Sequence, residues 1–180
     1  MYTLEKKDGV CVYKDTMLGI ELRLPEENCA GMVQTRELPA IDGQGAIEKA
    51  FSEPVSGKTL SEIARDKGAK TACILISDAT RGIPTAPMAK VAVDELVKGG
   101  LELKNITFFV AIGVHRPATE DEMKYALGEL HGKVECVNHT PFDKDNHIYL
   151  GDSTNDTPVT VNRRAYECDI HVQIGKVEPH

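Results

Sequence analysis

The chain has 180 residues, which fits one domain with at most a small appendage. Apolar residues make up 41% and charged residues 27%, as in globular proteins, so wholesale disorder is excluded. The formal net charge is −7 and Lys and Arg form no cluster, which argues against nucleic acid or a membrane surface as partner. No apolar run approaches the roughly 20 residues of a membrane span, and the amino terminus lacks the apolar core of a signal peptide. We therefore expect a cytoplasmic protein.

The first part of the chain predicts small β elements followed by two helices. Residues 10–13 and 20–24 are short runs of β-type residues, broken by Gly and charge, and indicate small strands. The pattern becomes helical over residues 44–51 and again over residues 59–66. The second of these helices opens with Thr-Leu-Ser-Glu, the signature of a capping box.

From residue 71 onward, apolar strand patterns alternate with amphipathic helix patterns. Buried strands are predicted over residues 71–77, 106–112 and 134–137, with further strand candidates over residues 159–161 and 169–174. One helix pattern ends at Gly99, and a second begins at the capping box of Thr119 and ends before Gly132. This rhythm predicts an α/β fold with a Rossmann-like, mostly parallel sheet, helices on both faces, and small β segments at the amino terminus.

Polar side chains follow the first two buried strands, where ligands bind in such sheets. After the first strand, Asp78 offers an acceptor, Thr80 a hydroxyl, and Arg81 a guanidinium that holds a carboxylate or phosphate through two hydrogen bonds. After the second strand, His115 carries an imidazole that exchanges protons near neutral pH. From position alone, a stabilised turn with an exposed Arg81 and a structural His115 remain alternatives.

Three further histidines do not have the spacing of a metal site. His131, His139 and His147 are eight residues apart, which does not place two of them one turn apart on a helix. A zinc hydrolase built on His131 and His139 is therefore disfavoured. We expect no metal site within this chain.

Four motifs follow one another along the chain. They are Ser77-Asp78-x-Thr80-Arg81-x-x-Pro84, Gly113-x-His115-Arg116-Pro117-x-Thr119, Tyr149-Leu150-Gly151 with Thr157-Pro158-Val159-x-Val161-Asn162-Arg163, and Gly175-x-Val177-Glu178-Pro179-His180. Together they resemble the amino-terminal domain of the nickel-pincer lactate racemase family, closely from about residue 54 onward and loosely before it. The resemblance implies that residues 1–180 are the amino-terminal, catalytic-half domain of a racemase-like protein, without its carboxyl-terminal domain.

The resemblance also implies the activity and the cofactor. It indicates an isomerase, a lactate-like 2-hydroxy acid racemase or epimerase that uses proton-coupled hydride transfer to a nickel pincer nucleotide. His115 and His180 would be the paired acid/base residues, and Arg81 would hold the substrate carboxylate. Asp78, Thr80 and Arg81 would bind the cofactor. A hydride acceptor suits this substrate, because the C2 hydrogen beside an ionised carboxylate is a very poor acid.

Two features depart from the family pattern. Asp156 stands where the resemblance leads us to expect Gly. The family continues beyond the position of His180 into a Gly-rich stretch, with a lysine that tethers the cofactor and a histidine that binds nickel, and then into a second domain. We therefore expect a folded fragment that is inactive and without cofactor by itself, with its own carboxyl-terminal domain as partner. The alternative is a non-catalytic α/β module that binds a small anionic ligand at the Asp78 loop.

Overall fold

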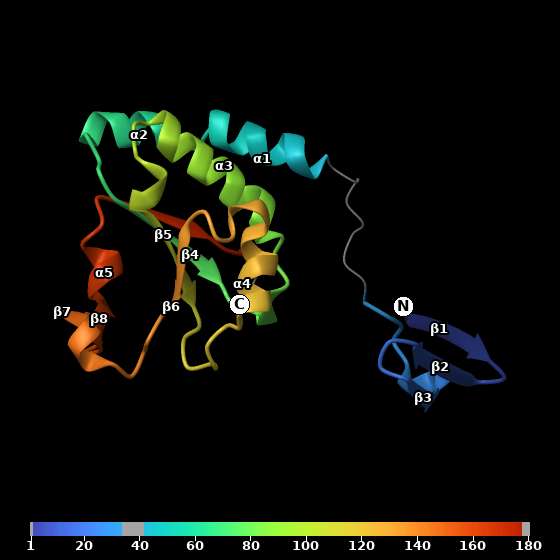
Figure 1. Ribbon diagram of the computed structural model, residues 1–180. Coiled ribbons are helices and arrows are strands. Elements are labelled where there is room, and N and C mark those ends of the chain that lie inside the picture. Colours follow the sequence, from blue (N-terminus) through green and yellow to red (C-terminus); the bar gives the residue numbers. More distant parts are fainter. Residues whose placement is uncertain (1, 34–41, 178–180) are drawn as a thin grey trace. The chain divides into compact units, whose positions relative to one another are not determined.

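The computed structural model describes residues 2–33 and 42–177 and divides into two compact units, residues 1–40 and residues 41–180. The first unit contains an antiparallel sheet, and the second is a larger α/β unit (Figure 1). In the described parts of the chain, no helix is both long and apolar enough to span a bilayer.

The amino-terminal unit is a three-stranded antiparallel sheet in the order β1-β2-β3. Its strands are β1 (Tyr2–Lys7), β2 (Val10–Asp15) and β3 (Ile20–Pro25), followed by a short 3-10 turn. The two strands predicted from sequence are confirmed. Strand β1 was not predicted, because charged residues dominate its second half. Asp8 and Gly9, both with positive φ, form the tight turn that joins β1 to β2.

The larger unit is built on a four-stranded parallel sheet in the order β6-β5-β4-β9. Its strands are β4 (Ala72–Ser77), β5 (Ile106–Ala111), β6 (Glu135–Asn138) and β9 (Ile170–Ile174). Helix α3 (Thr85–Lys98) connects β4 to β5, and α4 (Glu120–Leu127) lies between β5 and β6. The central strands are nearly continuous apolar runs, because both of their faces are covered.

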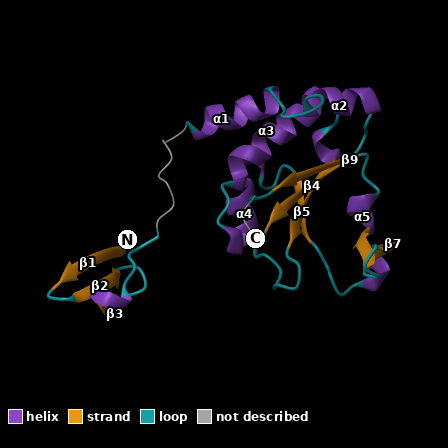
Figure 2. Cartoon of the chain, turned by 180° about the vertical axis from the view of Figure 1, so that it is seen from behind, coloured by secondary structure: helices purple, strands orange, loops and turns teal. Residues whose placement is uncertain are grey.

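Helices cover the two faces of this sheet unequally. Ile74, Ile76 and Phe108 point toward α3, α4, α1 (Gly43–Ser52) and α2 (Leu60–Lys67), and form the main core with them. The alternate residues Cys73 and Phe109 point to the other face, where the four-residue helix α5 (Arg163–Tyr166) packs through its alanine. Figures 1 and 2 show the sheet between these two groups of helices. The predicted α/β fold with helices on both faces is confirmed.

The second face also contains a cavity of about 440 Å³. It lies between the sheet, α5 and a neighbouring hairpin, and its lining is mostly apolar. Phe109 contributes its ring to the wall from the sheet, and Tyr166 from α5. The packing on this face is therefore less complete than on the face covered by α1–α4.

The predicted strand at residues 159–161 does not join the parallel sheet. It belongs to β8 (Pro158–Asn162), which pairs antiparallel with β7 (His147–Asp152), a strand that the sequence analysis missed. The connection between these strands is only five residues long, too short for the crossover that parallel pairing needs. Asp156 lies in this turn at φ 53°, the left-handed conformation in which Gly is least strained.

Both predicted capping boxes are present, but the helix that begins after Thr119 ends earlier than expected. Thr59 and Thr119 each accept a hydrogen bond from the backbone of a Glu three residues later, and the Glu side chain returns the bond. Helix α4 ends at Leu127, because Gly128 has φ 56° and ψ −125°, a backbone conformation outside the helical range. A 3-10 turn, Gly128–Leu130, follows.

Candidate active site

The strand order places a topological switch point at β4. The chain leaves β4 toward β5 through α3, whereas β9 lies on the opposite side of β4. Loops that diverge from neighbouring strands in this way leave a crevice beyond the carboxyl ends, the usual ligand site of open α/β sheets. The Asp78 loop follows β4 and residues 175–177 follow β9. His180 lies outside the described residues.

The Asp78 loop is a single 3-10 turn, Ala79–Arg81, held by the carboxylate that precedes it. Asp78 Oδ1 accepts hydrogen bonds from the Thr80 backbone N at 3.0 Å and from Thr80 Oγ1 at 2.5 Å. Gly82 ends the turn in the left-handed conformation. Arg81 is exposed, and its guanidinium makes no hydrogen bond or ion pair with any other residue that the structure describes.

The second candidate residue, His115, lies against this carboxylate. Strands β4 and β5 pair in parallel with Ser77 opposite Ala111, so their following loops start at the same level. His115 Nδ1 lies 2.5 Å from Asp78 Oδ2. The aspartate side chain is 9% exposed and the imidazole is 46% exposed. The loops after β4 and β5 therefore lie side by side, as the sequence predicts.

The protonation states follow from the hydrogen bonds around Asp78. Burial, the largest single effect, raises the pKa of the Asp78 carboxyl, but hydrogen bonds from Thr80 and His115 outweigh it and the pKa lies below its ordinary value. Asp78 is therefore ionised at neutral pH and only accepts hydrogen bonds. The proton of a neutral His115 must then be on Nδ1, which leaves a lone pair on Nε2.

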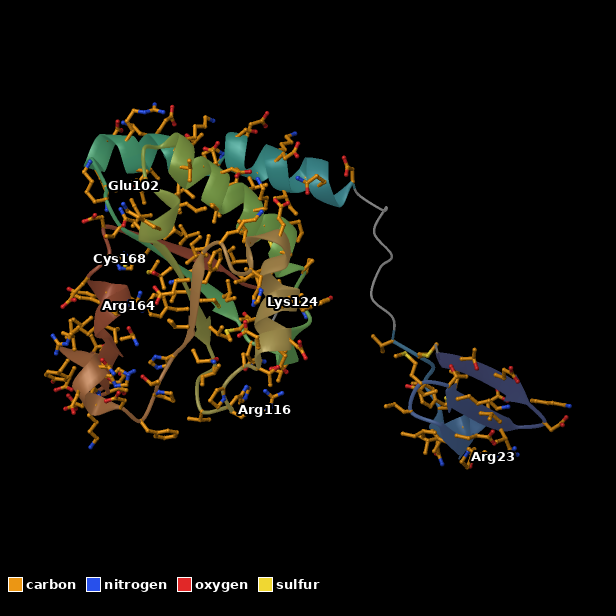
Figure 3. All side chains as sticks on the ribbon, viewed as in Figure 1. Arg23, Glu102, Arg116, Lys124, Arg164 and Cys168 are labelled. Atoms are coloured by element: carbon orange, nitrogen blue, oxygen red, sulfur yellow. The ribbon has the colours of Figure 1, made fainter. Side chains whose placement is uncertain are left out.

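An ion pair fixes the loop that carries His115 to the start of α4. Arg116 donates to both carboxylate oxygens of Glu122, at 2.8 and 2.7 Å, and to the carbonyl of Pro117. Hydrogen bonds from Arg116 and then from Thr119 lower the pKa of Glu122 to about 2. Figure 3 shows Arg116 at the end of the larger unit opposite Glu102, which precedes β5. No role was predicted for Arg116, although an Arg three residues before a capping box, and thus six before its Glu, is a signal that the sequence contains.

His131, His139 and His147 make other contacts. His131 Nε2 is 2.8 Å from Glu120 Oε1, and the rings of His139 and His147 lie with their centroids 5.3 Å apart. Burial, with His147 as a smaller contribution, lowers the pKa of His139. Over residues 2–33 and 42–177, no group of three His, Cys, Asp or Glu side chains is placed to hold a metal ion.

Fold and site together define a parallel α/β domain with an aspartate-bound histidine at the carboxyl ends of two central strands. The family model for the lactate racemase N-terminal domain matches residues 13–180. The chain therefore belongs to the lactate racemase N-terminal domain family.

Known relatives agree with this assignment. The chain is 28% identical over 161 residues to a lactate racemase of Thermoanaerobacterium thermosaccharolyticum, covering 87% of this chain and 37% of that protein. It is 27% identical over 165 residues to a lactate racemase of Lactiplantibacillus plantarum, covering 89% and 38%. The lactate racemase apoprotein structure from T. thermosaccharolyticum matches with a TM-score of 0.78, 28% identity, and coverage of 89% and 37%. The chain thus spans less than two-fifths of the length of these proteins.

Proposed function

We propose that residues 1–180 are the amino-terminal domain of a 2-hydroxy acid racemase or epimerase that uses a nickel pincer nucleotide. The observation that carries the proposal is the Asp78–His115 hydrogen bond of 2.5 Å at the strand ends, in a chain of the lactate racemase family. An acid/base histidine needs a fixed tautomer and a ring nitrogen that can reach the substrate. The bond at Nδ1 fixes the tautomer and leaves Nε2 for the substrate.

His115 acts through Nε2 in this proposal. The neutral ring accepts the hydroxyl proton of one substrate enantiomer at Nε2, and the resulting imidazolium is stabilised by ionised Asp78 at Nδ1. His180 would perform the same task for the other enantiomer, so that one histidine serves each face of C2. C2 becomes planar, as a 2-keto acid, only when its hydrogen also leaves as hydride to the acceptor that the cofactor would supply, and the proton and hydride can then be returned on either face.

Arg81 would hold the substrate carboxylate. Its exposed guanidinium makes no ion pair within the part of the chain that the structure describes, and a guanidinium binds a carboxylate through two parallel hydrogen bonds. The carboxylate of the substrate would thus be fixed beside the turn, Ala79–Arg81, on the loop that neighbours His115.

The donor and acceptor groups of the Asp78 loop fit a nucleotide cofactor. An ionised carboxylate has about four lone-pair sites, and the two Thr80 groups and His115 occupy three, which leaves one for a cofactor hydroxyl. The Thr80 hydroxyl, whose proton goes to Asp78, would accept a hydrogen bond from the cofactor, and Arg81 would add a cation for its phosphate. Among the described residues, no group of three His, Cys, Asp or Glu side chains could hold nickel without the donor atoms of the cofactor. When bound, the nickel pincer nucleotide supplies the hydride acceptor for the C2 hydrogen.

We also propose that this domain is inactive without its carboxyl-terminal domain and that it functions in the cytoplasm. The imidazole of His115 is nearly half exposed, so water reaches the site of proton transfer, whereas catalytic sites of this kind exclude it. All five cysteines are free thiols, as expected in a reducing compartment.

The test is a racemisation assay on the full-length protein loaded with the nickel pincer nucleotide, with 2-hydroxy acids deuterated at C2. We expect inversion with deuterium retained at C2, and we expect His115→Ala to lower kcat by at least about 100-fold with substrate affinity retained. His131→Ala is the matched control, since it also removes a histidine bound to a carboxylate, and should leave kcat unchanged.

Other results would favour the alternative function. Loss of ligand affinity in His115→Ala, in a protein that inverts no 2-hydroxy acid, would indicate a non-catalytic module that binds a small anion at Arg81. Nickel and pincer nucleotide bound stoichiometrically to residues 1–180 alone would contradict the proposal that this domain cannot hold the cofactor.

A further inference from the structure

His115 lies at the boundary of two cavities of different size and character. The smaller, about 50 Å³, is lined by the polar side chains of Asp78, Thr80 and Arg116 together with two alanines. The larger, about 330 Å³, extends from His115 between the loop after β5 and the loop after β6. A group that reacts at His115 therefore has a large space next to it in one direction and little space in the other.

Most of the larger cavity is apolar. Its apolar walls come from both loops and consist of Ile112, Pro117, Pro141 and Phe142. Phe142 is 80% exposed although it is aromatic, and it lines this cavity. Ligand sites are lined mainly by apolar and aromatic side chains with a few polar groups, and the lining of this cavity has that composition.

We propose that this cavity receives the C2 substituent of the substrate and selects 2-hydroxy acids with a bulky apolar side chain, aryl or branched alkyl, over lactate. The inference rests on the proposed function, in which the substrate hydroxyl lies at His115 Nε2. The C2 atom is one bond from that hydroxyl, so its substituent lies close to His115 and within reach of the larger cavity that adjoins it. The cavity of about 50 Å³ is too small for an aryl or branched alkyl group, since a cavity that binds benzene has about 150 Å³.

The volumes favour a large substituent. A cavity of about 150 Å³ with apolar walls is enough to bind benzene, and the cavity beside His115 has about twice that volume. The methyl group of lactate would leave most of this space empty or filled with water, and most of the apolar wall would gain no contact. A phenyl or isobutyl group would cover that wall and exclude water from His115.

One charged group at the cavity opposes acidic substituents. Asp143 lines it, and Asn146 Nδ2 donates to Asp143 Oδ2 at 2.5 Å, which holds the carboxylate in place. A substrate with a second carboxylate, such as malate, would place like charges together. The cavity thus combines attraction for apolar groups with rejection of dicarboxylates.

The experiment compares kcat/KM for lactate, phenyllactate and malate in the full-length protein loaded with nickel pincer nucleotide, for wild type and two variants. Phe142→Ala removes the rim aromatic, and Thr140→Phe fills the cavity from a lining position. Tyr149→Ala is the control, because it removes an exposed aromatic that does not line the cavity. Turnover of lactate serves in each variant as the check on folding.

We expect phenyllactate to exceed lactate by at least about 10-fold in kcat/KM, and malate to be the poorest substrate. Phe142→Ala should lower this preference about 10-fold or more, and Thr140→Phe should abolish phenyllactate turnover while lactate turnover persists. Equal or better use of lactate by wild type, or equal losses for both acids in Phe142→Ala, would overturn the inference while the proposed function stands. Inversion of no acid by wild type would instead reject the proposed function, and this inference with it.

Discussion

The two faces of the parallel sheet differ in how completely they are packed. One face is covered by four helices and encloses Ile74, Ile76 and Phe108 without exposure above 1%. The other carries the short helix α5 and adjoins a cavity of about 440 Å³. Loops at the carboxyl ends are thus anchored by a well-packed face, whereas the opposite face keeps open volume. One side of the sheet thus supports the site rigidly, and the other side keeps the open volume of this cavity.

The test with the largest expected effect compares two adjacent phenylalanines on β5. Phe108→Ala empties a fully enclosed site and should cost about 3–5 kcal/mol of unfolding free energy. Phe109→Ala removes a ring that already borders open space, so we expect it to cost about half as much, because fewer contacts are lost. Chemical denaturation of both variants measures the difference. Equal costs would show that the second face is packed as tightly as the first.

A second test concerns pH and the helix that covers the first face. Because the pKa of Glu122 is lowered from 4.5 to about 2, its ion pair and cap stabilise the folded state fully above about pH 4.5. This contribution is lost as pH falls through about 2, where the folded protein also binds the proton. We expect Glu122→Gln to lower Tm at pH 7, with the gap to wild type narrowing below pH 4.5. Thermal unfolding across this range measures it, with Glu129→Gln, on a neighbouring exposed carboxylate, as the control.

The smallest expected effect lies in the hairpin beside the second face. Asp156 has φ 53°, so Asp156→Gly relieves backbone strain but adds chain entropy to the unfolded state. The two effects oppose each other, and we expect a net gain below about 1 kcal/mol. Thermal unfolding measures it against Asp152→Gly, in β7, which should destabilise. A loss of stability in Asp156→Gly would show that the aspartate side chain stabilises this turn.

The helix-covered part of the fold was readable from the sequence because its signals are local. Buried strands such as β4 and β5 are continuous apolar runs, and the capping boxes at Thr59 and Thr119 mark helix starts within four residues. Strand β7 could not be predicted from the sequence. It contains His, Gly and Asp, and its pairing with β8 depends on a turn in which Asp156 adopts a conformation unusual for its type.

The candidate site was predictable in position but not in its contacts. The rule that ligands bind at the carboxyl ends of parallel strands is enough to bring Asp78, Thr80 and His115 to one crevice. Which nitrogen of His115 meets the carboxylate depends on side-chain geometry that no residue pattern encodes. The cavity beside His115 needs two loops, after β5 and after β6, to converge, and their sequences carry no signal of that meeting.

The turn that follows β4 has a thermodynamic consequence. Asp78 already holds the backbone of Ala79–Arg81 before any ligand arrives, so binding does not have to order that backbone. The remaining entropy loss on this loop comes from the exposed Arg81 side chain, about 2 kcal/mol if all its rotamers are fixed. The affinity of this loop for a carboxylate should therefore depend on how many of those rotamers the ligand immobilises. Because the backbone at this strand end is already ordered, an anion binds there with a smaller loss of entropy.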